Sequence, residues 1–262
     1  MACVIIWAVV SIVLIVLVES LRSYTMQHTR RHKPILNNRT PWVLVELYRH
    51  FGFFSLGALT TLLFTELAKY TVGRLRPFYL TACGVKLTPE LCKDEFGYEK
   101  FVVIDDDAMC DNLLSGQFTK KQLIDARLSF LSGHSSFSFY CGMFLIIYLQ
   151  ARLNNIPRAD NKCVRLVLRV LKVMRPFLQF GMIILSLWIS LTRISDYRHH
   201  PLDVIFGALV GMTFATVTLI VIGDVFTRRS AFWKTCSDEK QQLTDQMNNP
   251  LRPMLHSENH NI

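Results

Sequence analysis

Hydrophobic residues in this chain gather into five long runs separated by polar segments. The runs cover roughly residues 2–18, 51–68, 130–149, 177–192 and 204–223. A membrane-spanning helix needs about 20 mostly apolar residues, and the first and last runs contain no charged residue. One such run also fits a buried helix of a soluble protein, but five in 262 residues favour a polytopic membrane protein.

We therefore predict an all-α membrane protein, a bundle of about five transmembrane helices. Residues 1–223 are expected to form the membrane-embedded domain, with residues 69–129 as an outer loop that caps it. Residues 224–262 are polar and are expected to form a disordered cytoplasmic tail. We interpret the first run as a retained helix, because it has no basic leader and no clear cleavage site.

The charges between the runs predict how the helices are oriented, because basic connecting segments mark the cytoplasmic side. The segment between the first two runs carries Arg22, Arg30, Arg31, Lys33, Arg39 and Arg49 against Glu19 and Glu46. Residues 164–174 alternate apolar and basic positions, which predicts an interfacial helix on the same side. The acidic 69–129 loop and the short 193–203 loop are expected on the outer side. The net charge of +9 follows from the basic segments, and we find no nucleic-acid-binding motif.

Three of the seven cysteines, Cys83, Cys92 and Cys110, lie in the predicted outer loop. Disulfides persist on that side of a membrane. Three cysteines cannot all pair with one another, and their spacing does not choose the partners. We expect a disulfide within this set and leave its pairing open.

The polar stretch after the second run carries Lys69, Arg74 and Arg76, followed by Pro77. Lysine offers a point charge and arginine a planar fork, and both suit phosphate oxygens. Basic residues at a helix end more often extend to lipid headgroups. This stretch alone is therefore a weak indication of a phosphate site.

The third run opens with Ser132, Gly133 and His134. The amino end of a helix presents unpaired N–H groups and positive potential, which favour an anion. Ser132 is the expected N-cap, and Gly133 allows the backbone to approach a phosphate closely. A capping serine beside an interfacial histidine is the simpler alternative.

The last stretch, between the fourth and fifth runs, contains Arg193, His199 and Asp203. Residues four apart face each other if the segment is helical, so Asp203 would fix the tautomer of His199 and free its other nitrogen to attack. Arg193 would hold the phosphate. An exposed polar turn is the structural alternative, but ionisable residues so close to hydrocarbon are functional candidates by default.

The stretches KYTVGRLRP, SGHSSFS and RISDYRHHPLD resemble, in order and spacing, the three motifs of the type 2 phosphatidic acid phosphatases. The resemblance is closest to the integral-membrane lipid phosphate phosphatases and covers residues 2–223. It implies hydrolysis of phosphatidate, lysophosphatidate, sphingosine phosphate or ceramide phosphate through a phosphohistidine, with no metal or other cofactor. It also implies that the protein works in the bilayer, in the plasma membrane, with an outward-facing site, and it suggests homo-oligomers.

Carried over by position, the resemblance makes His199 the nucleophile, Asp203 its orienting partner, and His134 the acid and base for the leaving group and water. The implied phosphate-binding residues are Lys69, Arg76, Ser132, Gly133 and Arg193. This chain departs from the pattern in having Thr192 for serine and Leu131 for the proline of the broader superfamily. The family has six spanning helices, and this chain begins at what resembles the second.

Two other functions also fit these residues. A metal-dependent hydrolase would use His134, His199, His200 and Asp203 as ligands, and its activity would be lost in chelator. A lipid-phosphate transporter or inactive scaffold would bind the same ligands without forming a phosphoenzyme.

Overall fold

The computed structural model describes residues 2–27, 42–85, 93–99, 110–154 and 161–222. The predicted tail at 224–262 and Cys92 lie outside these ranges.

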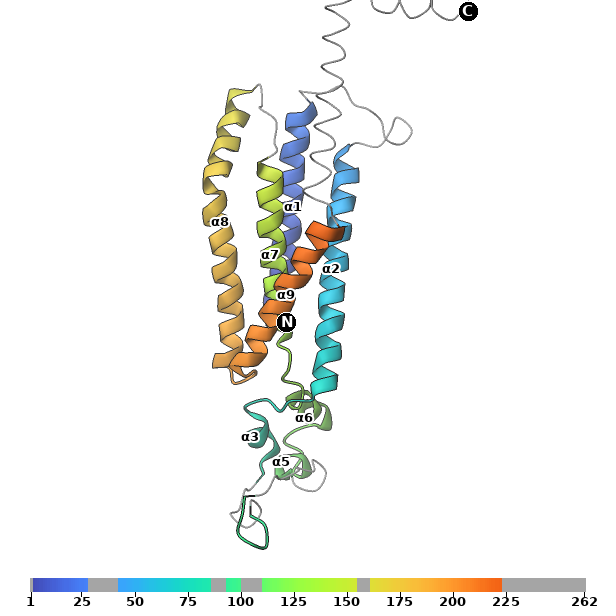
Figure 1. The fold of residues 1–262 in the computed structure, drawn as a ribbon, viewed down its shortest axis with the longest axis vertical. Helices are drawn as coiled ribbons and strands as arrows, with labels where there is room; N and C mark the ends of the chain where they lie inside the picture. The colour runs from blue at the N-terminus through green and yellow to red at the C-terminus, as the bar shows by residue number, and fades with distance from the viewer. Residues whose placement is uncertain (1, 28–41, 86–92, 100–109, 155–160, 223–262) are drawn as a thin grey trace, which may run out of the picture.

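Five long helices in the described ranges form a bundle, which confirms the predicted fold class (Figure 1). They are α1 (Ala2–Gln27), α2 (Trp42–Val72), α7 (Gly133–Leu153), α8 (Lys162–Ser195) and α9 (Pro201–Val217), and a π-helical turn, η1 (Thr218–Ile222), follows α9. Helix α7 is the most buried of the five, and each of the other four packs against it. Each of the five is long and apolar enough to cross a membrane, so the chain is an integral multi-pass membrane protein.

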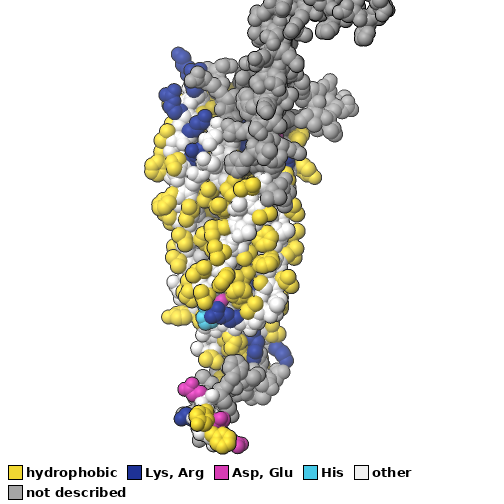
Figure 2. Space-filling model, in the orientation of Figure 1, with side chains coloured by type: hydrophobic (Ala, Val, Ile, Leu, Met, Phe, Trp, Pro, Cys, Tyr) yellow, Lys and Arg dark blue, Asp and Glu magenta, His cyan; other side chains and the backbone are white. Residues whose placement is uncertain are grey.

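The flank of the bundle is covered by hydrophobic side chains, and basic side chains gather beyond both ends of this belt (Figure 2). Leu63 on α2 and Leu209 on α9 are 61% and 50% exposed. Because lipid tails solvate such side chains as well as a protein interior does, this surface is suited to hydrocarbon rather than water.

The helices extend beyond the apolar runs seen in the sequence, and α8 does so most clearly. Its 34 residues span about 51 Å at 1.5 Å per residue, against a hydrocarbon core of about 30 Å. Residues 164–174, predicted as a separate interfacial helix, are instead the first turns of α8. The helix continues through Pro176, which a transmembrane helix tolerates because neighbouring groups satisfy the freed carbonyl.

Glu19 and Glu46, assigned by the sequence pattern to a connecting segment, lie within α1 and α2 and are buried. Arg152 of α7 ion-pairs with both carboxylates, at 3.0 Å for Glu19, and also contacts His50. The hydroxyl of Tyr148 donates to Glu19 at 2.9 Å. The buried charges compensate one another. Because their partners come from α1, α2 and α7, the network links these three helices at the end opposite the candidate site.

Glycines on α9 bring it into backbone contact with α7. A Cβ on Gly207 would lie 2.8 Å from the Ser132 carbonyl oxygen, and one on Gly211 would overlap the carbonyl oxygen of Ser136. Small residues four apart commonly allow transmembrane helices to approach this closely. The backbone N–H of Ser132 consequently reaches the carbonyl of Asp203 at 3.2 Å, so the first turns of α7 and α9 lie side by side.

A small cap follows α2 and packs beyond the end of the bundle (Figure 1). It contains α3 (Tyr79–Cys83), α5 (Asp111–Leu114) and α6 (Lys120–Ala126) around its own hydrophobic cluster. A disulfide joins Cys83 to Cys110, which settles the pairing left open by the sequence. The N–H of Arg76 donates to the carbonyl of Ala126 at 2.9 Å, so the cap positions the stretch that carries Arg76.

Candidate active site

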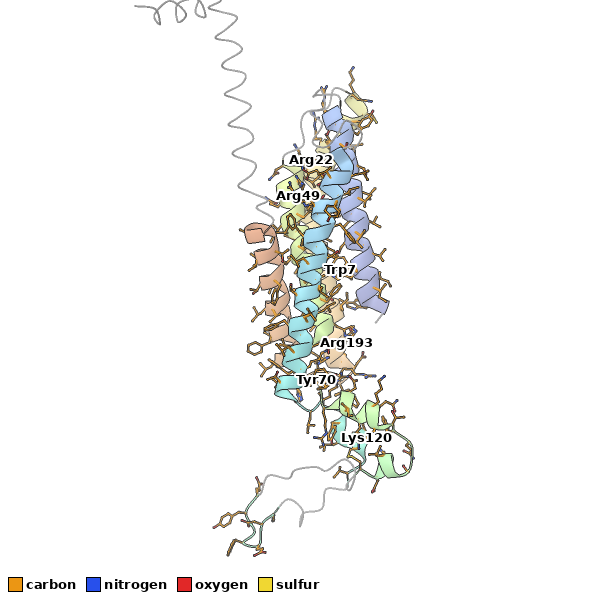
Figure 3. The ribbon with its side chains drawn as sticks, turned by 90° about the vertical axis from the view of Figure 1, so that its right-hand side faces the viewer. Trp7, Arg22, Arg49, Tyr70, Lys120 and Arg193 are labelled. Carbon is orange, nitrogen blue, oxygen red and sulfur yellow. A yellow bond between two sulfur atoms is a disulfide. The ribbon has the colours of Figure 1, made fainter. Side chains whose placement is uncertain are left out.

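The three polar stretches meet at one end of the bundle. Helices α2 and α8 end there and α7 and α9 begin there, next to the cap. Figure 3 shows Tyr70 and Arg193 at this end, away from Arg22 and Arg49 at the other. Residues from four helices can therefore act on one ligand.

The ring of His199 is buried, with 5% of its surface exposed, and its Nδ1 lies 2.7 Å from the carbonyl oxygen of Ser129. A carbonyl can only accept, so Nδ1 carries the proton and Nε2 carries the free lone pair. Burial, together with the positive charge of Arg76, lowers the pKa of His199 to about 4. The ring is therefore neutral near pH 7 and is suited to act as a nucleophile.

The turn that carries His199 is fixed by its backbone. The N–H groups of Arg198 and His199 both donate to the carbonyl of Arg193, at 3.0 and 3.3 Å. Tyr197 adopts the left-handed conformation with φ of 54°, which is uncommon for a residue with a side chain. Such conformations persist where surrounding bonds hold them, and here they place His199 against Ser129.

Asp203 is fully buried and accepts three hydrogen bonds. Its donors are Nη1 of Arg74 at 2.7 Å, Oγ of Ser129 at 2.6 Å and the N–H of His200 at 3.1 Å. The sequence pattern predicts that His199 and Asp203 face each other across one turn of a helix. They do not, because α9 begins only at Pro201 and His199 lies before it. Asp203 instead holds Ser129, whose carbonyl orients His199.

Ser129 and Arg74 are thus part of the site. The sequence pattern placed Arg74 in the first polar stretch without giving it a role, and it did not indicate Ser129. Arg74 stands beside Arg76 in the first motif, and that proximity was a usable signal. Ser129 contributes mainly a backbone carbonyl, which every residue possesses. Sequence patterns carry no signal for such a contact.

The amino end of α7 offers unpaired donors. Ser132 occupies the N-cap position, yet its buried Oγ has no hydrogen-bond partner in the part of the chain that the structure describes. A Cβ on Gly133 would lie 3.4 Å from Nζ of Lys69, so the ammonium group stands directly beside the amino end of α7. A hydroxyl, free N–H groups and an ammonium group together form a suitable binding site for an anion. His134 lies in the same first turn, within the electrostatic influence of Arg193 and Lys69.

Each of the three candidate phosphate-binding cations is paired with a carboxylate that is more than half exposed. The pairs are Lys69 with Glu66 at 2.5 Å, Arg76 with Asp125 at 2.9 Å, and Arg193 with Asp196 at 2.8 Å. Burial lowers the pKa of Arg76, and Asp125 opposes that shift. Because the carboxylate of each pair is exposed to solvent while the cation is mostly buried, solvent weakens the attraction and a phosphate group can displace these carboxylates.

The geometry does not favour the metal-dependent alternative. Nδ1 of His199 bonds to Ser129, Nε2 of His200 lies 3.1 Å from the carbonyl of Leu75, and Asp203 is engaged by three donors. Within the described ranges, the close group of metal-type ligands that we find is Glu19, Glu46 and His50. Arg152 contacts all three of these residues.

The chain is thus a multi-pass membrane protein of five long helices, with cations and two imidazoles gathered in a candidate anion-binding site at one end. The profile of the PAP2 superfamily matches residues 51–226, and the chain belongs to that superfamily. It is 34% identical over 203 residues to phospholipid phosphatase 1 of Rattus norvegicus, covering 77% of this chain and 60% of that protein. It is 36% identical over 183 residues to phospholipid phosphatase 2 of Homo sapiens, covering 70% and 54%.

Phospholipid phosphatase 2 of Rattus norvegicus is 32% identical over 228 residues, which cover 87% of this chain and 70% of that protein. The chain spans less than two thirds of the other two relatives. No solved structure gives a significant match.

Proposed function

We propose that the protein is a lipid phosphate phosphatase that hydrolyses phosphate monoesters of membrane lipids without a metal. Phosphatidate, lysophosphatidate, sphingosine phosphate and ceramide phosphate are the substrates it is proposed to take. The observation that carries this proposal is the buried His199, whose Nδ1 is held by the Ser129 carbonyl, so that Nε2 is free near the positive charges of Arg76 and Lys69. The names of the relatives, phospholipid phosphatases 1 and 2, support the same activity.

In the first step, Nε2 of His199 attacks phosphorus and the bond from phosphorus to the lipid oxygen breaks. His134 gives its proton to the leaving alkoxide, so the products are a free lipid alcohol and a phosphohistidine. Positive charge develops on the ring of His199, and it is stabilised by the Ser129 carbonyl and by the nearby carboxylate of Asp203.

In the second step, His134 takes a proton from water and the resulting hydroxide attacks phosphorus. The phosphorus–nitrogen bond breaks, which releases inorganic phosphate and returns His199 to its neutral form. Lys69, Arg76 and Arg193, with Ser132 and the amino end of α7, would hold the phosphate oxygens throughout. Phosphoryl transfer depends mainly on such positioning and charge stabilisation, so fixed cations can replace a metal.

We further propose that the site faces outward, at the plasma membrane. Two features support this orientation. The disulfide between Cys83 and Cys110 lies in the cap at the site end, and disulfides persist outside the cytosol. In the described ranges, Arg22 and Arg49 lie at the other end (Figure 3), as do the basic first turns of α8, and basic residues are expected on the cytoplasmic side.

The test is phosphate release from lysophosphatidate by purified protein in detergent, comparing His199→Gln with His200→Gln. We expect His199→Gln to lose at least about 10³-fold in kcat, because removal of a nucleophile abolishes the covalent route. His200→Gln should stay within about tenfold of the unchanged protein, because that ring bonds to the Leu75 carbonyl. Near-normal turnover by His199→Gln would exclude it as the nucleophile.

Two further measurements separate the alternatives. Activity that persists in EDTA contradicts a metal-dependent hydrolase. A brief reaction with labelled substrate followed by denaturation in alkali should trap an acid-labile phosphohistidine, and the His199→Gln protein should not trap it. A protein that binds lysophosphatidate but gives neither phosphoenzyme nor free phosphate would be a transporter or scaffold.

A further inference from the structure

A cavity of about 310 Å³ lies between α7, α8 and α9 at the site end of the bundle. Its lining residues all belong to these described helices, and all but Ser190 are hydrophobic. Ser190 donates its hydroxyl to the Ser186 carbonyl at 2.8 Å. A buried water needs two to four polar partners, and this lining offers none that is free, so the cavity is suited to an apolar occupant.

The cavity begins beside the candidate catalytic residues. Its wall on α9 starts at Pro201, two residues after His199, and its wall on α8 ends at Ile194, the residue after Arg193. From there the walls extend to Ala208 and Leu187. Seven residues of helix correspond to about 10 Å, so the cavity runs from the phosphate site about two helical turns toward the middle of the bilayer.

The cavity opens sideways into the lipid. Leu191 on α8 and Ile205 on α9 stand at its rim and are 55% and 52% exposed. The floor is formed by buried residues, among them Val204, at 6% exposure. Helices α8 and α9 diverge from the turn that joins them (Figure 1), and the cavity occupies the space at the base of this divergence.

We propose that this cavity, the α8–α9 groove, binds the first segment of the hydrocarbon chain of the lipid phosphate substrate. The proposal rests on the phosphatase function proposed above. A lipid whose phosphate lies between the site cations has its chain directed along the groove, because both begin at the same turn. The chain moves between two apolar environments, so the gain comes from close van der Waals contact and from orientation of the ester.

The groove therefore gives the site a preference for long-chain esters over soluble ones. Ala208→Phe places a ring at the deep end of the groove, and Leu209→Phe, at the next, lipid-facing position, is the matched control. For Ala208→Phe we expect kcat/KM for oleoyl lysophosphatidate to fall about tenfold or more, since a misplaced ester reacts slowly. The rate for butyl phosphate, which is too short to reach Ala208, should change less than about twofold. Leu209→Phe should leave both rates unchanged.

A photolabel tests occupancy without turnover. A lysophosphatidate with a diazirine near the carboxyl end of its chain should label residues 187–194 and 201–208 in the unchanged protein. Excess unlabelled lysophosphatidate should compete, phosphatidylcholine should not, and Ala208→Phe should lose the label.

The outcomes separate the two proposals. The groove proposal would be overturned if Ala208→Phe lowered the rates for both substrates equally or lowered neither. It would also be overturned if the label spread over other helices and unlabelled lysophosphatidate did not compete. A protein that shows the competed label but releases no phosphate would refute the phosphatase function and leave the groove standing.

Discussion

At the level of single residues, the chemistry of His199 is set by groups far away in the sequence. The Ser129 carbonyl fixes which ring nitrogen is protonated, and Arg76 with burial keeps the ring neutral. Sequence motifs pointed to His199, but they assigned its orientation to Asp203. That assignment assumed a helix through both residues, and α9 begins after His199.

We predict that His199 titrates well below an ordinary histidine. Its pKa is lowered to about 4 in the folded protein, against about 6.5 in an unfolded chain. Modification by diethylpyrocarbonate requires the neutral ring, so its midpoint at His199, followed by peptide mass spectrometry, should lie near pH 4 in native protein. A native midpoint near 6.5 would contradict the assigned environment.

The same shift affects stability. Between pH 4 and 6.5 the unfolded chain binds a proton at this position that the folded protein does not bind, so stability rises with pH in this window. The contribution of His199 to the free energy of unfolding is therefore complete above about pH 6.5 and is lost as the pH falls toward about 4.

The carboxylates that form ion pairs with the candidate phosphate-binding cations should compete with the substrate phosphate for them. We predict that Asp196→Asn, which removes the ion pair of Arg193, lowers KM for lysophosphatidate by about two- to fivefold, because a partly exposed ion pair is worth about 1 kcal/mol or less. Glu95→Gln removes the same charge within the 93–99 segment and is the control. An unchanged or higher KM in Asp196→Asn, relative to this control, would show that Asp196 does not compete.

At the level of the helices, the site depends on how closely α7 and α9 approach. Gly207 and Gly211 allow that approach, and with it the contact between Ser132 and Asp203. A small-x3-small pattern was visible in the sequence, but nothing in it named α7 as the partner. The partner depends on the packing of helices separated by almost fifty residues along the chain.

We predict that Gly211→Ala destabilises the protein by about 1–3 kcal/mol, the usual cost of overpacking, because its Cβ would overlap the carbonyl oxygen of Ser136. Phosphate release should fall as well, since α7 and α9 both carry site residues. Gly181→Ala on α8 is the matched control, because a Cβ there meets nothing within 4 Å. Thermal unfolding in detergent measures both variants, and equal melting temperatures would contradict the close α7–α9 contact.

At the level of the whole molecule, the two ends of the bundle differ in chemistry. One end carries the site and the disulfide-bonded cap, and the other carries the buried charge network and the exposed Cys163. A single direction of insertion would place all three motifs on one side of the membrane.

We predict that Lys120→Cys in the cap reacts with a membrane-impermeant maleimide in intact cells, whereas Cys163 reacts only after permeabilisation. The background should replace the other cysteines by serine, except the Cys83–Cys110 pair. Cys163→Ser should remove the second signal. Labelling of both positions from the same side would refute the proposed orientation.

The sequence by itself determined the membrane class, the number of long helices and the superfamily, because run length and motif spacing are properties of the chain alone. It did not determine the length of α8 beyond the apolar run, because charged residues that extend past the hydrocarbon still form helix. Only the tertiary structure decided that Cys83 pairs with Cys110, that Ser129 orients His199, and that a groove opens between α8 and α9. Each of these depends on distances between atoms that lie far apart along the chain, and packing alone sets those distances.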